Sequence, residues 1–190
     1  MRKTGRMAWI LALLALCALL TACAQQTDDP VAARYRDTEI RRSTVLYEQQ
    51  NLAAVRGEAV TERQALESVL KNCIMVDEAE RLGLRVTQDE IDREVQGQRD
   101  NYEQYAEIRE YVDAWCAEQG ITTEDYFARV ADELPRVMLR QRLRDTLGEQ
   151  YCEEHGLTFT KVNPPQEMTD YVNAYLDGLL DTYAGEITYY

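Results

Sequence analysis

Apolar residues recur at intervals of three and four along most of the chain beyond residue 35, the spacing of one face of an α-helix. Glycines and the few prolines fall between these stretches, where helices are expected to end. No run of alternating apolar and polar residues is long enough to predict a strand. The pattern therefore predicts an all-α fold of about five to six helices. They are expected at residues 36–56, 61–82, 87–97, 106–118, 123–147 and 168–183.

Local signals sharpen several of these boundaries. Thr61 and Thr87 are each followed three residues later by Gln or Glu, which is the capping-box pattern of a helix start. Gly97 is expected to weaken or break the helix that begins after Thr87. Tyr189 and Tyr190, at the end of the chain, are expected to be frayed.

The last helix carries the most regular apolar stripe in the sequence. A stripe of this width buries one helix face, either in the protein's own core or against another molecule. The spacing favours the core and leaves the binding surface as an alternative. The stripe consists of Met168, Tyr171, Val172, Tyr175, Leu176, Leu179, Leu180 and Tyr183.

The N-terminus has the layout of an export signal. Arg2, Lys3 and Arg6 precede residues 7–22, which contain no charged residue. Sixteen helical residues extend only about 24 Å at 1.5 Å per residue, and a bilayer needs about 20 apolar residues. The segment is therefore expected to be a cleaved signal peptide.

The sequence LTAC at residues 20–23 resembles the lipobox of bacterial lipoproteins. That resemblance implies cleavage before Cys23 and a diacylglyceryl group on its sulfur. Acyl chains anchor a protein stably when at least two are attached. Residues 23–35 are then a polar, flexible tether, and the folded domain spans residues 36–190. The alternative is an ordinary signal peptide with a coincidental cysteine.

Charge limits the classes of partner. The chain has 34 acidic and 21 basic residues, a net charge of −13, and removing the three cations of the signal leaves about −16. Nucleic acid and anionic lipid both attract basic surfaces, so neither is an expected direct ligand. Membrane attachment is therefore expected to depend on the lipid at Cys23.

Three cysteines remain in the predicted domain, namely Cys73, Cys116 and Cys152. They are expected to act as small apolar residues, and the alternative is one disulfide between Cys116 and Cys152. Cys152 also lies three residues before His155, the only histidine. A Cys₃His metal site or a Cys–His catalytic pair is conceivable, but no orienting acid or paired ligand spacing accompanies them. No metal, cofactor or catalytic residue is therefore predicted.

Residues 55–147 resemble the N-terminal chaperone domain of SurA-type and PrsA-type foldases. The central match, residues 75–91, reads MVDEAERLGLRVTQDEI, where the family ends one helix and caps the next. Residues 55–61 (VRGEAVT) resemble the family's opening, although Arg56 stands where asparagine is usual. Residues 120–126 (GITTEDY) and 137–147 resemble the entry to its next helix and its closing helix.

The resemblance implies an irregular helical cradle with the C-terminal helix packing back on the N-terminal ones. It also implies binding of unfolded, exported polypeptides outside the cytoplasm. The 39 residues after Tyr151 are too few for the parvulin-type isomerase domain that most relatives carry, so isomerase activity is not expected. Candidate contacts to the unfolded client are Tyr171, Tyr175, Leu179 and Tyr183.

Two other functional classes remain open. A lipid-anchored adaptor would use the same helices to bind one dedicated protein, and an enzyme would depend on Cys152 or His155. The outer membrane is the expected location in a cell with two membranes, because no Asp follows Cys23.

Overall fold

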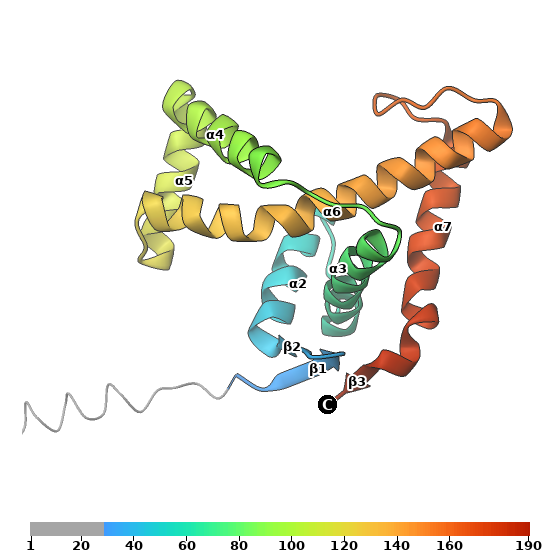
Figure 1. The fold of residues 1–190 in the computed structure, drawn as a ribbon. Helices are drawn as coiled ribbons and strands as arrows, with labels where there is room; N and C mark the ends of the chain where they lie inside the picture. The colour runs from blue at the N-terminus through green and yellow to red at the C-terminus, as the bar shows by residue number, and fades with distance from the viewer. Residues whose placement is uncertain (1–28) are drawn as a thin grey trace, which may run out of the picture.

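The computed structural model describes residues 29–190, and its helices pack on one another around a small sheet (Figure 1). The expected all-α character is confirmed. The packing of the C-terminal helix on earlier helices is confirmed as well, because α7 contacts α3 and α6. The helices are α2 (Arg42–Arg56), α3 (Glu62–Arg81), α4 (Gln88–Gln104), α5 (Ala106–Gln119), α6 (Thr123–His155), α7 (Gln166–Thr182) and the 3₁₀ helix η1 (Ala184–Glu186).

The absence of strands was a wrong expectation. Three short strands, β1 (Val31–Tyr35), β2 (Thr38–Arg41) and β3 (Ile187–Tyr189), form an antiparallel sheet in the order β2–β1–β3. Strands of three to five residues show too few alternations for a period of two to stand out. The central strand also takes one neighbour from the far end of the chain, which no local pattern reveals.

The sheet moves two predicted boundaries. The tether, expected to reach residue 35, gives way to β1 at Val31, and the first helix begins at Arg42 instead of residue 36. Ala33 and Tyr35 are buried in β1, so this part of the chain belongs to the folded domain.

The C-terminal residues are also ordered into the sheet. Tyr189 lies opposite Ala33, and the Tyr190 backbone N–H donates to the Ala32 carbonyl at 3.1 Å. The expectation that Tyr189 and Tyr190 fray was therefore wrong, because backbone pairing to β1 holds them.

One part of the molecule, which we name the base, contains residues 29–86 and 135–190. It comprises the sheet, α2, α3, α7 and the later part of α6, and α3 contacts β1, α2, α6 and α7. Its core is mainly aliphatic, and the side chains that are less than 2 % exposed include Leu70, Ile74, Met75, Leu143 and Leu176.

The other part, which we name the arm, contains residues 87–134 and comprises α4, α5 and the first turns of α6 (Figure 1). The capping boxes at Thr61 and Thr87 form as predicted, and Thr122 makes a third at the start of α6. The break expected at Gly97 is wrong. α4 continues through Gly97 and stops at Tyr105, whose backbone is extended (φ −108°, ψ 114°).

The later helices also depart from the predicted bounds. α6 continues past residue 147 to His155, where Gly156 ends it in the left-handed conformation at φ 66°. No helix in residues 29–190 is both long enough and apolar enough to cross a membrane.

Candidate functional site

A groove with a volume of about 400 Å³ opens between the β1–β2 turn, α2, α3 and α6. We name it the central groove. Its apolar lining comes from Val69, Cys73 and Val76 of α3, together with Tyr35 and Tyr47. Tyr47 is 56 % exposed, so an aromatic face borders the opening. The volume falls within the range of ligand-binding clefts.

Charged side chains surround this apolar lining. Arg36 pairs with Asp77, Arg136 pairs with Glu133 at 2.8 Å, and all four residues line the groove. Arg140 also lines it, and among residues 29–190 no carboxylate lies within 4.0 Å of its guanidinium. Burial lowers the pKa of Arg140, which marks a guanidinium that has lost water without gaining a direct ionic partner.

Cys73 is half-buried in the same lining. Burial raises the pKa of its thiol, and the nearby Arg136 and Arg140 only partly oppose this effect. A thiol with a raised pKa stays protonated at neutral pH, and the thiolate is the nucleophilic form. The side chain therefore serves the groove as a small apolar surface.

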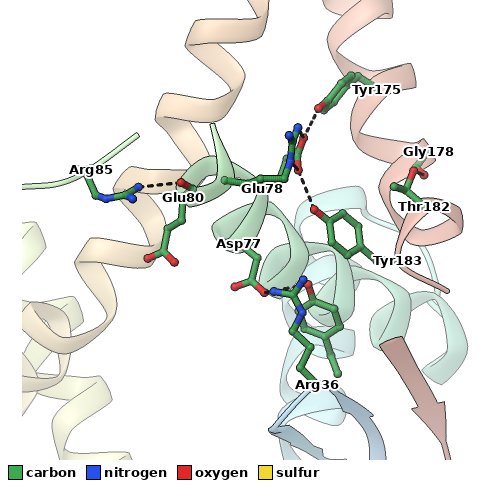
Figure 2. Close-up of polar contacts among 11 residues, drawn as sticks. Arg36, Asp77, Glu78, Glu80, Arg85, Tyr175, Gly178, Thr182 and Tyr183 are labelled. Carbon is green, nitrogen blue, oxygen red and sulfur yellow. Dashed lines mark hydrogen bonds and ion pairs between the residues drawn. The ribbon is translucent and has the colours of Figure 1, made fainter. Parts of the chain in front are cut away.

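Next to the groove, a buried carboxylate connects α3 to α7. Glu78 is 3 % exposed, and it accepts hydrogen bonds from Arg81 (2.7 and 2.8 Å), Tyr183 (2.8 Å) and Tyr175. Figure 2 shows both tyrosines pointing from α7 toward the carboxylate. These donors, with Arg81 first, lower the pKa of Glu78 to about 2, so it is ionised at neutral pH.

A second polar group connects α3 to the sheet. Asp77, the neighbour of Glu78, accepts from the Tyr35 hydroxyl at 2.9 Å and from Arg36. Arg36 also pairs with Glu186 of η1. Adjacent carboxylates on α3 thus hold α7 on one side and the sheet on the other, and together they fix one wall of the central groove.

The candidate client contacts on α7 do not lie at the groove. Leu179 and Tyr183 are buried in the core of the base, and Tyr175 is half-buried with its hydroxyl on Glu78. Tyr171 is 41 % exposed, and its ring lies 4.9 Å from that of Tyr151. Most residues of the apolar stripe therefore pack in the protein's own core, as the spacing favoured.

The structure also bears on the alternatives for the cysteines, namely a disulfide, a metal site and a Cys–His pair. Cys73, Cys116 and Cys152 all carry free thiols, so the alternative of a Cys116–Cys152 disulfide is wrong. Cys152 is buried in α6, whereas His155 is exposed, and its ring stacks on Tyr151 at 4.0 Å. Within residues 29–190, no three His, Cys, Asp or Glu side chains are grouped as metal ligands. Cys23 lies outside the described residues.

Sequence reasoning did not identify Arg36, Asp77, Glu78 or Arg140. A usable signal existed for one of them, because Glu78 follows Leu70 and Ile74 at steps of four and so falls on the buried face of α3. Arg140 joins the groove only because α6 crosses α3, a long-range arrangement with no local signal.

Comparison with known proteins leaves the resemblance to chaperone domains resting on the quoted motifs alone. No protein-family model matches the chain, and no curated protein is significantly similar to it.

Proposed function

We propose that this protein is a chaperone-like lipoprotein, anchored outside the cytoplasm through Cys23, that binds unfolded exported polypeptides without isomerase activity. The observation that supports the proposal best is the central groove. It offers an apolar floor, an exposed aromatic side chain at Tyr47 and the unpaired guanidinium of Arg140 in one cleft.

These features suit an unfolded segment better than one fixed small molecule. Apolar side chains of the client gain about 25 cal/mol for each Å² that they remove from water. The Arg140 guanidinium donates to backbone carbonyls, which every client sequence supplies. Binding of this kind is weak and tolerant of sequence, and it ends when the client buries the same side chains in its own fold.

The base holds this groove in one shape. The carboxylates of Asp77 and Glu78 are satisfied by donors from the sheet and from α7, so they fix α3 and do not compete for the client. The strongly acidic surface keeps the carrier soluble and opposes its self-association.

The test is suppression of aggregation of two unrelated unfolded proteins by residues 24–190, with a proline-isomerisation assay on a short peptide alongside. We expect suppression near a one-to-one ratio and no isomerase activity. The variant Tyr47→Asp should reduce the suppression several-fold, whereas the same change at Tyr190, which is 69 % exposed and lies outside the groove, should not.

Arg140→Met separates the two parts of the mechanism, because it removes the donor and keeps an apolar stem in the groove. A several-fold loss would support backbone recognition by the guanidinium. If the unmodified protein protects neither client, general chaperoning is wrong. The adaptor alternative is then tested by isolating one stoichiometric partner from the native membrane.

A further inference from the structure

The negative charge of the molecule is concentrated in the arm. Residues 87–134 contain 14 acidic and 4 basic residues, a net charge of −10. The base, residues 29–86 and 135–190, contains 19 acidic and 14 basic residues, a net charge of −5. The arm is the smaller part, so its surface has a much higher density of negative charge.

Several carboxylates on α5 have no partner among the described residues. The carboxylates of Glu107, Glu110 and Glu118 make no hydrogen bond or ion pair with any of residues 29–190, while that of Asp113 accepts from the Tyr102 hydroxyl at 2.8 Å. The one cation on α5, Arg109, donates to the backbone carbonyls of residues 102 and 103. The negative charge of this helix is therefore directed at solvent.

The same helix exposes large apolar side chains. Tyr105, directly before α5, and Ile108 and Tyr111 within it recur every three residues and are 48 %, 38 % and 70 % exposed. Ile108 borders a hollow of about 150 Å³ whose other walls include Tyr102 and Phe127.

Aromatic contacts extend this surface onto α6. The rings of Trp115 and Tyr126 meet edge to face at 5.5 Å, and those of Tyr126 and Phe127 at 5.2 Å. Burial raises the pKa of the Tyr126 phenol, and the charge of Tyr111 adds to this effect. The exposed side chains of α5 thus continue into a packed aromatic cluster that supports them.

Charge decides what this surface binds. A second copy of the chain brings another arm with a net charge of −10, and anionic lipid and nucleic acid are repelled in the same way. A cationic side chain is attracted in two ways, by ion pairs with the free carboxylates and by cation–π contact with the faces of the tyrosine rings. The hollow beside Ile108 accepts an apolar side chain.

We propose that the α5 face of the arm, formed by Tyr105, Glu107, Ile108, Glu110 and Tyr111, is a docking surface for a polypeptide segment in which Lys or Arg alternates with apolar residues. The surface lies in a different part of the molecule from the central groove. Its binding does not require the groove, so this inference stands or falls separately from the proposed function.

The test uses residues 24–190 and a fluorescent 12-residue peptide in which lysine alternates with leucine. Binding is measured by anisotropy at 50 and 300 mM salt. We expect binding at low salt that weakens about tenfold or more at high salt, because the attraction acts between exposed charges. A peptide with glutamate in place of lysine should not bind, and one with serine in place of leucine should bind several-fold more weakly.

Variants locate the site. Glu107→Gln with Glu110→Gln should weaken binding about tenfold, and Tyr111→Ser should weaken it several-fold. The matched control, Glu153→Gln with Glu154→Gln, removes the same charge from the exposed end of α6 in the base and should change binding less than twofold. Tyr47→Asp in the central groove should also leave it unchanged.

Equal losses from the α5 pair and the control pair would overturn the inference, because the peptide would then respond to net charge alone. Equal binding of the leucine and serine peptides would overturn it as well. Failure of aggregation suppression with intact peptide binding would reject the proposed function and leave the docking surface standing.

Discussion

The base and the arm differ in the kind of side chain that they bury. They also differ in how far apart in the sequence their contacting residues lie. In the base, Tyr183 reaches Glu78 across 105 residues and Arg36 reaches Glu186 across 150. In the arm, Tyr102 reaches Asp113 across 11 residues. The base core is mainly aliphatic and continuous. The buried residues of the arm are few, namely Ile91, Val112, Cys116, Phe127 and Leu134.

This difference has a consequence for stability. A part with few buried apolar contacts opens locally at a lower free energy than the part that contains the main core. The arm is attached to the base by the connection between α3 and α4, by α6, and by the pair between Arg142 and Glu90, whose nitrogen and oxygen lie 2.5 Å apart. We expect the arm to open while the base stays folded.

The largest expected effect comes from removing a buried isoleucine from the base, with a buried isoleucine of the arm for comparison. Ile74→Ala removes a fully buried side chain from the base and should cost about 2–5 kcal/mol of global stability. Ile91→Ala in the arm should cost less, because Ile91 is 8 % exposed. Denaturant unfolding measures the first effect, and amide hydrogen exchange should confine the second to α4, α5 and the start of α6. Equal loss of protection in α3 on Ile91→Ala would show that the two parts unfold together.

Removing the buried carboxylate should have the next largest effect. Glu78→Gln leaves the Arg81 guanidinium and two tyrosine hydroxyls with a weaker acceptor, and we expect a loss of about 1–3 kcal/mol. Denaturant unfolding measures it. Glu80→Gln, two residues later on the exposed side of the same helix, is the control and should change stability by less than about 0.5 kcal/mol.

Low pH should lower the free energy of unfolding of the base, the part of the molecule that contains Glu78, by protonating this carboxylate. The folded-state pKa of Glu78 is about 2, below its ordinary 4.5, so its contribution is present above the ordinary pKa and is lost as pH falls through 2. Between pH 6 and pH 3 we expect a loss of about 1–2 kcal/mol from this group. Tyr175 acts in the opposite sense, because its pKa is raised to about 12 and its contribution is lost above pH 10. Thermal unfolding of the unmodified protein and of Glu78→Gln at several pH values measures both, and an identical acid slope in the two proteins would contradict the assignment.

The smallest expected effects come from two helical glycines. An added Cβ at Gly148 in the base would lie 2.9 Å from the Phe159 ring and 3.1 Å from the Met168 sulfur, so Gly148→Ala should destabilise by about 1–2 kcal/mol before the gain in helix propensity. At Gly97 in the arm, a Cβ meets nothing within 4 Å. Gly97→Ala should therefore stabilise α4 by about 0.5–1 kcal/mol. Hydrogen exchange of α4 reports the second change, and stabilisation by both substitutions would show that the contact at Gly148 relaxes freely.

The sequence predicted those features that depend on neighbouring residues. The helices at Thr61 and Thr87 begin where their capping boxes place them, because a cap involves only four consecutive residues. The β1–β2 hairpin escaped prediction because its strands are too short to show alternation, and β3 escaped it because its partner β1 lies more than 150 residues earlier. The central groove escaped it for the same reason, since it exists only where α2, α3 and α6 face one another.

The pairing of β3 with β1 also sets the order in which the molecule is completed. A chain emerges from its N-terminus, so β1 stays without one of its two neighbours until Ile187–Tyr189 arrive. Arg36 likewise has no Glu186 to pair with until the C-terminal residues are present, and Glu78 lacks its donors Tyr175 and Tyr183 until then. All arm residues are present by residue 134, and their contacts are short in sequence, which favours early formation. The arm can therefore fold before the base is complete, and a chain in transit presents an open β1 edge until Ile187–Tyr189 are available.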